Sequence, residues 1–399
     1  MRIGFAAPVD PTALLRHIPD LPTEGVYSFP YTAALVNGYL DRGHSVVVFA
    51  QSSSPGPKRT YLSKDGNLTV HISRRRKAAR LRAADLFLLE RRRIARLIRR
   101  SDVDVVHAHW TYEFAAAALS SGKATVVTAH DSPLALTQNF AGFYWRRRSQ
   151  LGTKVLQRSV SLTAVSPTLA TEIAASGSRE RPIVIANGVE TPDGTAVRSV
   201  QNVDSPSFMC IANGFDGRKN TASAVKAFQR FRRTLPNSKL TMIGLGHEPG
   251  GACERWAQSV GHCTNIEFLG CIPHEQVISL LKSKIDILVH TSRWEACSLA
   301  ILEAQSYGIP GIGGMDSGGV AYTLGEGNSG ILVDVQSAED ISCAMSRLVS
   351  DEDFYEQQSV AAISQCQGTF SLDLVVDQYI EVLAKAADSL IPSLGEGGM

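Results

Sequence analysis

The chain of 399 residues is 44% hydrophobic and 20% charged, which is ordinary for a globular protein and excludes a disordered or fibrous chain. Its length favours two domains of roughly 200 residues each. No apolar run reaches the roughly 18 residues of a membrane-spanning helix, and the start, MRIGFAAPVD, is typical of a buried strand rather than a signal peptide. The seven cysteines contain no Cys-x-x-Cys pair, which argues against disulfides or a structural zinc and favours a cytoplasmic protein.

The formal charge of +2 conceals two halves of opposite sign. Residues 1–190 hold 26 Lys and Arg against 14 Asp and Glu, a net charge of +12, and the remaining residues hold 14 against 24, a net charge of −10. Such a division suits two lobes, of which only the first attracts an anionic partner.

Short apolar runs alternate with helical patterns along the whole chain. In chain order, the expected strands are RIGFAA, SVVVFA, VDVVHAH, TVVTAH, SLTAVS and PIVIANG, then SFMCIAN, KLTMIG, NIEFLG, IDILVHT, IPGIGG and GILVDV. Most are continuously apolar, which is typical of parallel strands covered on both faces. Segments such as 31–42, 221–232 and 275–282 supply the crossover helices. The pattern predicts an α/β protein with two doubly wound, Rossmann-like lobes.

A polar stretch, TPDGTAVRSVQNVDSPS, separates the two series and is expected to link lobes at 1–190 and 205–370. The end, FSLDLVVDQYIEVLAKAADSL, has the pattern of one amphipathic helix. Ligands of open α/β sheets bind outside the carboxyl ends of the strands. We therefore expect a site in a cleft between two facing lobes, and the residues that follow strands are the candidates for its chemistry.

The stretch SRWEACSLAILEA, residues 292–304, follows the strand IDILVHT and carries two carboxylates. Ser298 is a suitable N-cap for a helix that ends near Gly308, and the amides of its first turn would stabilise an anion such as phosphate. Glu295 precedes this helix and Glu303 lies within it, so the two would contact different parts of one long ligand. The alternative is that Glu303 is an ordinary exposed carboxylate.

This stretch resembles the E-x7-E motif of the family 4 retaining glycosyltransferases, which have the GT-B fold. Further blocks match that family in order along nearly the whole chain: GHSVVVFA, DVVHAH, TVVTAHD, AVSPTLA, VIANGVE, FLGCIPHEQVISLLKSKIDILVHTS and GIPGIGGMDSGGV. The resemblance implies an enzyme that moves a sugar from a nucleotide diphosphate sugar to an acceptor hydroxyl with retention of configuration. It implies no metal or other cofactor, and a role in bacterial polysaccharide or glycolipid synthesis.

The resemblance also distributes these roles over the chain. The lobe at 1–190 would bind the saccharide or lipid-linked acceptor, and the lobe at 205–370 would bind the nucleotide sugar. The final helix, at about 371–399, resembles the segment with which family members cross back onto the first lobe.

Within the motif, the resemblance implies that Glu303 hydrogen-bonds the ribose hydroxyls and that Glu295 contacts the donor sugar. A carboxylate suits a vicinal diol because its two oxygens can accept from two hydroxyl groups. The amides around Cys297, Ser298 and Leu299 would help to hold sugar and phosphate. Cys297 and Ser298 stand where the family often has Phe-Gly, a departure that bears on the identity of the sugar.

A second candidate site is IANGFDGRKNTASAVKAF, where a strand ends in a Gly-rich turn and Arg218, Lys219 and Asn220 open the next helix. Cations there can neutralise the diphosphate that departs as the glycosyl bond breaks. Lys219 aligns with the family's lysine. Gly214 falls near the position of the family's arginine, so Arg218 is the candidate replacement. The alternative is that Arg218 and Lys219 are solvated surface residues.

In the first lobe, His130 ends the strand TVVTAH, and the resemblance implies that it contacts the donor sugar. His107 and His109 share one face of a strand, as metal ligands can. No carboxylate or cysteine cluster completes such a site, so no metal is expected. His109 is assigned instead to the acceptor side, together with Gly25, which falls near the family's Gly-Gly loop.

A basic segment at 71–100, HISRRRKAARLRAADLFLLERRRIARLIRR, and the later FYWRRR carry much of the first lobe's charge. Leu86, Leu89, Ile94 and Leu97 are expected to pack inward while the arginines face out. A solvated surface is one interpretation. The charge density favours another, attachment to an anionic surface on the inner face of the cell membrane. No nucleic-acid-binding motif accompanies the charge, so nucleic acid is not expected as a partner.

Two other functions are compatible with these residues. A sugar-nucleotide epimerase of the GT-B fold would need acid and base groups around the sugar and no acceptor surface. A non-catalytic nucleotide-sugar-binding subunit would suit the departures from the family pattern at Gly214, Ser298 and Tyr322, the last of which stands where an acidic residue is common.

Overall fold

The computed structural model describes residues 1–54, 56 and 59–389. The chain forms two compact units, which are described separately: Met1–Ala186 together with the C-terminal residues from Leu372, and Asn187–Ser371. Residues 191–207, predicted as a linker, belong to the second unit. Residues 390–399, the end of the predicted final helix, lie outside the described residues.

The first unit is built on an eight-stranded sheet in the order β3-β4-β2-β1-β5-β6-β7-β8. Neighbouring strands are parallel except β3, which is antiparallel to β4. The strands are β1 (Arg2–Ala6), β2 (Ser45–Ser52), β3 (Thr60–Leu62), β4 (Leu68–Arg74), β5 (Val105–His109), β6 (Ala124–Ala129), β7 (Leu162–Ala164) and β8 (Ile183–Val184). The parallel pairing places the carboxyl ends of β4, β2, β1, β5 and β6 at one edge.

Helices cover this sheet. They are α1 (Pro30–Asp41), α2 (Ala79–Ala84), α3 (Leu88–Arg100), α4 (Glu113–Leu119), α5 (Pro133–Asn139), α6 (Phe143–Leu156), α7 (Pro167–Ala175) and α15 (Leu372–Asp388), with a 3-10 turn at Thr12–Leu14. Proline occupies the first turn of α1, α5 and α7, where its fixed φ suits a helix start and its missing N–H costs no hydrogen bond.

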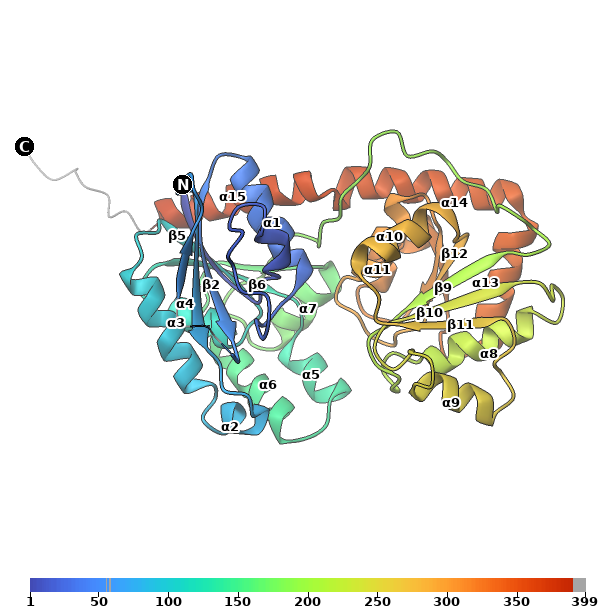
Figure 1. Ribbon diagram of the computed structural model, residues 1–399, viewed down its shortest axis with the longest axis horizontal. Coiled ribbons are helices and arrows are strands. Elements are labelled where there is room, and N and C mark those ends of the chain that lie inside the picture. Colours follow the sequence, from blue (N-terminus) through green and yellow to red (C-terminus); the bar gives the residue numbers. More distant parts are fainter. Residues whose placement is uncertain (55, 57–58, 390–399) are drawn as a thin grey trace, which may run out of the picture. The chain divides into compact units, whose positions relative to one another are not determined.

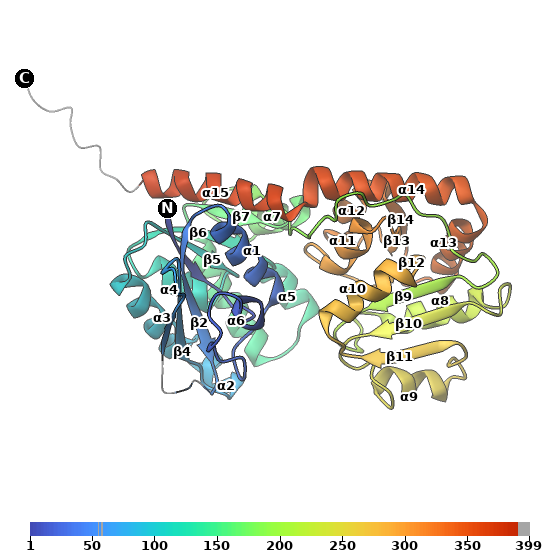
Figure 2. The same ribbon diagram turned by 45° about the horizontal axis from the view of Figure 1, so that its top comes forward.

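The last helix, α15, packs against the first unit beside α1 (Figures 1 and 2). Arg42, which follows α1, forms ion pairs with Asp373 at 3.1 Å and with Asp377 on α15. Gly38 lies at the closest approach, because a Cβ atom built on it would stand 2.6 Å from Cγ2 of Val376. The missing side chain at residue 38 therefore lets the two helices come together.

The second unit contains six parallel strands in the order β11-β10-β9-β12-β13-β14. The strands are β9 (Ser207–Ile211), β10 (Lys239–Ile243), β11 (Ile266–Gly270), β12 (Ile287–His290), β13 (Gly311–Gly314) and β14 (Gly330–Val333). The helices are α8 (Thr221–Phe231), α9 (Ala252–Ser259), α10 (His274–Ser283), α11 (Leu299–Ser306), α12 (Val320–Thr323), α13 (Ala338–Ser350) and α14 (Glu352–Gln365), with short turns at Gly325–Gly327 and Cys366–Phe370.

Consecutive residues of these strands pack into two different cores, one on each face of the second sheet. Phe208 and Cys210 of β9 join the core formed with α8, α9 and α13, whereas Met209 joins the core formed with α10 and α11. Ile287 and Leu288 of β12 divide in the same way. Since both faces are buried, both sides of each strand are apolar, and the strands read as continuous apolar runs.

The structure confirms the predicted fold class of two doubly wound parallel sheets, and all twelve expected strands are present. β3 and β4 are additional. The sequence of β4, LTVHISR, mixes polar with apolar residues, so a search for apolar runs does not find it. Within the described part of the chain, no helix is long and apolar enough to cross a membrane.

Candidate functional site

At the carboxyl edge of the second sheet, two basic side chains meet one carboxylate. Nζ of Lys219 lies 2.5 Å from Oε1 of Glu295, and Nη1 of Arg218 lies 3.6 Å from the same oxygen. Lys219 and Glu295 expose 14% and 18% of their side chains, so the ion pair is shielded from water but still accessible. Lys219 and Arg218 from one sequence motif thus contact Glu295 from another.

Backbone contacts position these side chains. Oδ1 of Asp216 accepts hydrogen bonds from the N–H groups of Arg218 and Lys219 at 2.9 and 2.8 Å, which closes the turn after β9. The N–H of Arg293 donates to the carbonyl of Arg218 at 2.8 Å and ties this turn to the loop after β12. β9 and β12 are neighbours in the sheet, so their two loops meet at its edge.

Two left-handed residues complete the loop geometry. Asn220, which precedes α8, has a φ of 52°, a conformation that asparagine tolerates better than most residues, and its side-chain amide donates to the carbonyl of Val335 at 2.7 Å. Gly318 has a φ of 68°, and a Cβ atom there would stand 2.6 Å from the carbonyl oxygen of Glu295. That oxygen accepts a hydrogen bond from the N–H of Gly319 at 2.7 Å, so the glycine pair closes directly on the Glu295 loop.

Glu295 is ionised in this environment. Burial opposes its ionisation, but the charges of Lys219 and Arg218 outweigh burial and hold the pKa of Glu295 below its usual value. Nε2 of His290 lies 3.9 Å from Oε1 of Glu295. Burial lowers the pKa of His290 to about 4, so its ring is neutral at pH 7. The carboxylate is therefore held by two permanent cations and one neutral imidazole.

Glu303, the second carboxylate of the motif, has a different partner. Its Oε1 lies 2.9 Å from Nε2 of His274, the first residue of α10, and this hydrogen bond raises the pKa of His274. Glu303 lies on α11, whose N-terminus is capped as predicted, because Oγ of Ser298 accepts from the N–H of Ile301. The side chain of Glu303 exposes 19% of its surface, so it is less exposed than the ordinary surface carboxylate of the alternative.

Burial and a backbone hydrogen bond fix the residues between the two carboxylates. Cys297 is buried, with 7% of its surface exposed, and burial raises the pKa of its thiol to about 12. Its carbonyl accepts a hydrogen bond from Nδ2 of Asn187 at 2.9 Å, so the IANGV turn supports the motif directly. Leu299 is the first residue of α11. Gly214, in the turn after β9, has a φ of 113° and donates its N–H to the carbonyl of Leu245 at 2.8 Å.

In the first unit, His130 follows β6 and lies beside His109, the last residue of β5. Nε2 of His130 and Nδ1 of His109 are 2.9 Å apart, and the ring of Trp110 packs on His130 with centroids 4.5 Å apart. Burial lowers the pKa of both histidines, to about 3 for His130. Both rings are therefore neutral at pH 7, and one donates the shared hydrogen bond to the other.

His107 is a core residue. Its ring nitrogens lie 2.9 Å from the hydroxyl of Tyr39 and 2.7 Å from Oγ1 of Thr128, and its ring packs against Tyr379 of α15 with centroids 4.7 Å apart. Across the residues that the structure describes, no group of three or more His, Cys, Asp or Glu side chains could hold a metal ion.

Two further positions singled out in the sequence are Gly25 and Tyr322. Gly25 lies exposed in the loop after β1, with a φ of 68°, and its carbonyl accepts from the N–H of Ser53 at 2.9 Å. Tyr322 lies on α12 and packs edge to face on Phe370, with centroids 5.3 Å apart. Burial raises the pKa of Tyr322 to about 12, so its hydroxyl is neutral at pH 7.

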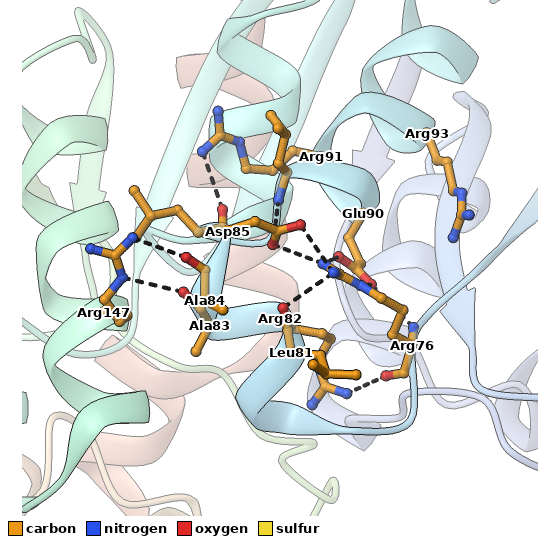
Figure 3. A network of polar contacts seen from close by, with 12 residues as sticks. Arg76, Leu81, Arg82, Ala83, Ala84, Asp85, Glu90, Arg91, Arg93 and Arg147 are labelled. Atoms are coloured by element: carbon orange, nitrogen blue, oxygen red, sulfur yellow. Dashed lines mark hydrogen bonds and ion pairs between the residues drawn. The ribbon is translucent and has the colours of Figure 1, made fainter.

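The basic segment is partly turned inward, which corrects the expectation that its arginines face out (Figure 3). Arg76 is held by Asp85 at 2.8 Å and by Glu90 at 2.6 Å. Arg82 is buried and donates to two carbonyl groups of the loop before α2. These side chains stabilise a loop and are not part of an exposed basic face.

The outward-facing arginines form one face of α3. They are Arg92, Arg93, Arg96, Arg99 and Arg100. Ile94 and Ile98, one turn apart, define the opposite, buried face. Leu89 was expected to pack inward and is instead 40% exposed, because it lies well off the line of Ile94 and Ile98 around the helix.

Sequence reasoning missed three polar residues of these sites. His290 is a buried polar residue at the end of an otherwise apolar strand, five residues before Glu295, and that position was the available signal. Asp216 stands two residues before Arg218, the spacing of an Asx turn. No sequence signal connects His274 with Glu303, because the two lie on different helices.

Comparisons with known proteins match each unit to a family. Residues 30–192 match Glycosyltransferase Family 4, and residues 195–365 match Glycosyl transferases group 1. The lipopolysaccharide core biosynthesis glycosyltransferase LpsE of Rhizobium meliloti is 24% identical over 222 residues, which cover 55% of this chain and 62% of LpsE. The match thus spans less than two thirds of that relative's length.

Solved structures share the fold over nearly the whole chain. Sucrose-phosphate synthase from Thermosynechococcus elongatus has a TM-score of 0.76 at 16% identity and covers 98% of this chain and 100% of its own. HepE from Anabaena, in complex with UDP-glucose, has a TM-score of 0.69 at 16% identity and covers 96% of this chain and 100% of its own. With a family match on each unit and the GT-B fold throughout, the chain belongs to the family 4 glycosyltransferases.

Proposed function

We propose that the protein is a retaining glycosyltransferase that moves a sugar from a nucleotide diphosphate sugar to an acceptor hydroxyl in bacterial polysaccharide or glycolipid synthesis. The observation that carries the proposal is the ion pair of Lys219 with Glu295, joined by Arg218, at the carboxyl edge of the second sheet. Cations in this position can bind a diphosphate, and the carboxylate can accept sugar hydroxyls. No metal or other cofactor is proposed.

In the proposed reaction, the bond between the anomeric carbon and the β-phosphate oxygen breaks. The acceptor oxygen bonds to the anomeric carbon from the same face, and its proton passes to the departing phosphate. Lys219 and Arg218 stabilise the charge that gathers on the diphosphate. Glu295 orients the sugar through its hydroxyl groups, and no side chain is assigned as a nucleophile.

Glu303 is the proposed ribose contact, and His274 fixes the orientation of its carboxylate. The capped start of α11, with the amides around Cys297, Ser298 and Leu299, is the proposed cradle for sugar and phosphate. Gly214 and Asn220 shape the turn that presents the two cations.

His130 is the proposed donor-sugar contact from the first unit. Its neutral ring can donate one hydrogen bond and accept another, and the contact with His109 engages one of its nitrogens. Gly25 and His109 are assigned to the acceptor side. Support for a nucleotide-sugar donor comes from HepE, which was solved with UDP-glucose. Support for glycolipid synthesis comes from LpsE, a glycosyltransferase of lipopolysaccharide core biosynthesis.

The test compares Lys219→Ala with the control Lys226→Ala. Lys226 is an exposed lysine on α8, the helix that follows Lys219. We expect hydrolysis or transfer from UDP-glucose, the first donor to try, to fall roughly 100-fold or more in Lys219→Ala, as for loss of one preorganised charge-stabilising group. Lys226→Ala should keep the wild-type rate. Equal rates in all three proteins would remove Lys219 from the proposed site.

Two other outcomes would favour other functions. Conversion of a nucleotide sugar to its epimer without any acceptor would identify a sugar-nucleotide epimerase. Binding of nucleotide sugars without any turnover, across a panel of donors and acceptors, would identify a non-catalytic binding subunit.

We also propose that the protein attaches to anionic membrane surfaces through α3. The five arginines on its exposed face support this proposal, because they present one sign of charge without intervening carboxylates. Attachment would place the site near a lipid-linked acceptor.

A further inference from the structure

We propose that His290 is a positioning residue, which hydrogen-bonds Glu295 when a nucleoside diphosphate draws Lys219 away from that carboxylate. The inference rests on the glycosyltransferase function proposed above and adds an exchange of hydrogen-bond partners to its donor-binding step.

Lys219 has two tasks in the proposed site, and the same hydrogen bond cannot serve both. In the free protein its Nζ lies 2.5 Å from Oε1 of Glu295. In the proposed reaction the same ammonium group stabilises the departing diphosphate, so phosphoryl oxygens compete with Oε1 for it. Because a diphosphate carries more negative charge than one carboxylate, we expect it to draw the ammonium group towards itself.

Glu295 needs another hydrogen-bond donor once Lys219 has moved. Its side chain is only 18% exposed, so water can solvate the carboxylate only in part. A shielded carboxylate that loses its cation keeps the cost of its desolvation without compensation. Nη1 of Arg218 lies 3.6 Å from Oε1, which is too far for a hydrogen bond, and Arg218 is itself assigned to the diphosphate.

His290 can supply the missing donor. Its Nε2 lies 3.9 Å from Oε1 of Glu295, roughly 1 Å beyond the length of a normal hydrogen bond. Nε2 is buried and has no hydrogen-bond partner among the residues that the structure describes. A buried polar atom without a partner is costly, so a short movement of the carboxylate would satisfy both groups at once.

The fold fixes the backbone of both residues and leaves the side chain of Glu295 to move. His290 is the last residue of β12 and pairs with Gly313 of β13. The N–H of Glu295 donates to the carbonyl of Ser317 at 3.2 Å, and its carbonyl accepts from the N–H of Gly319 at 2.7 Å. Rotation about the side-chain bonds of Glu295 is therefore sufficient to bring Oε1 to Nε2.

The charge state of His290 suits this exchange. Burial lowers the pKa of His290 to about 4, and the charges of Lys219 and Arg218 add to this effect although Glu295 opposes it. The neutral ring carries its single proton on one nitrogen, and the carboxylate oxygen facing Nε2 favours that nitrogen. His290 can thus donate to Glu295 without repelling Lys219 while the lysine is still in place.

The exchange links donor binding to the sugar contact. With His290 bonded to Oε1, Glu295 stays ionised and oriented after Lys219 has turned to the diphosphate. The carboxylate can then accept from sugar hydroxyls, as proposed above. Lys219 is assigned to the phosphate at the glycosyl bond, so a nucleoside diphosphate should cause the exchange and a nucleoside monophosphate should not.

The test is calorimetric titration of the full chain with UDP, GDP and ADP, and then with the monophosphate of the base that binds most tightly. His290→Met removes the donor and keeps an apolar side chain of similar size. His290→Gln keeps an N–H donor near the position of Nε2. We expect His290→Met to bind the diphosphate at least about tenfold more weakly than wild type, since a hydrogen bond to a charged group is lost.

The conservative variant and the monophosphate separate this role from a merely structural one. His290→Gln should recover most of the lost diphosphate affinity, and the monophosphate should bind wild type and both variants equally. Equal diphosphate affinity of wild type and His290→Met would overturn the proposal. So would an equal loss in both variants, or a loss for the monophosphate as large as that for the diphosphate. If His290→Met does not fold, as judged by circular dichroism, His290→Leu replaces it with the same expected loss.

Sugar transfer, measured separately, distinguishes this inference from the proposed function. Diphosphate binding that depends on His290, in a protein that transfers no sugar, would leave the exchange standing and remove the proposed function. Sugar transfer by wild type with unchanged diphosphate affinity in His290→Met would do the opposite. Absence of binding by all three nucleoside diphosphates would remove both.

Discussion

A single oxygen atom organises the candidate site of the second unit. Oε1 of Glu295 faces nitrogen atoms of Lys219, Arg218 and His290 at 2.5, 3.6 and 3.9 Å. The carboxylate and the cations stabilise each other. Removing either leaves a partly buried charge without a partner, and for a fully buried ion pair this costs about 3–5 kcal/mol of folding stability. Activities of variants at these positions are therefore interpretable only beside their melting temperatures.

The contact of His274 with Glu303 should make stability depend on pH near neutrality. The hydrogen bond to Glu303 raises the pKa of His274, so its contribution is fully present below the unfolded value of roughly 6.5 and is lost as pH rises through the higher folded value. We expect His274→Gln to lower the melting temperature more at pH 6 than at pH 9 in differential scanning calorimetry. His262→Gln, in the same unit, is the control. An equal loss at both pH values would contradict this contact.

Part of the site could be predicted from single residues and part could not. Glu295 and Lys219 each follow a strand within a recognisable block, so their meeting follows from the neighbouring positions of β12 and β9. The partnership of Glu303 with His274 depends on how α10 and α11 pack, which no local pattern records. The inward turn of Arg82 depends on carbonyl groups of a loop whose path is fixed by Arg76 and its carboxylates.

At the scale of elements, α15 is held to α1 by the fit between Gly38 and Val376. Gly38 lies within a helix, where glycine costs roughly 0.5–1 kcal/mol relative to alanine, so its presence reflects the close approach of α15. Most strands could also be predicted, because their packing leaves a pattern in the sequence. Their apolar runs follow from burial on both faces, whereas β4, which is also mostly buried, includes the buried polar residues Thr69 and Ser73 and so lacks an apolar run.

Gly38→Ala should therefore destabilise the protein, although alanine is the better helix former. The added methyl group would stand 2.6 Å from Cγ2 of Val376, and overpacking of this kind costs about 1–3 kcal/mol. Chemical denaturation monitored by circular dichroism measures the loss. The double variant Gly38→Ala/Val376→Ala should lose less than the sum of the two single changes, and strict additivity would show that the helices do not meet there.

At the scale of the whole molecule, residues 1–190 carry a net positive charge and the remaining residues a net negative charge. Five arginines of the positive half lie on the exposed face of α3. Several arginines on one helix face add their attractions to an anionic surface, at roughly 1 kcal/mol for each residue near it. Because salt screens this attraction over about 10 Å, it should weaken steeply as ionic strength rises.

We expect the protein to float with anionic liposomes at low salt and to be released at high salt. The variant Arg92→Glu/Arg96→Glu/Arg99→Glu should remain at the bottom of the gradient. Lys226→Glu/Arg233→Glu/Lys239→Glu changes the net charge equally with exposed residues of the second unit and should still float. No flotation of the wild type at any salt concentration, or equal loss in both variants, would remove the proposed membrane surface.

The buried thiol of Cys297 has a practical consequence. A thiol whose pKa is near 12 carries almost no thiolate at neutral pH, and thiolate is the form that reacts with alkylating reagents and oxidants. The exposed Cys271 and Cys343 should therefore be consumed first by maleimides. Fluorophores can be attached at those two positions while the loop between the two glutamates stays chemically untouched, and mild oxidative stress should spare that loop in the same way.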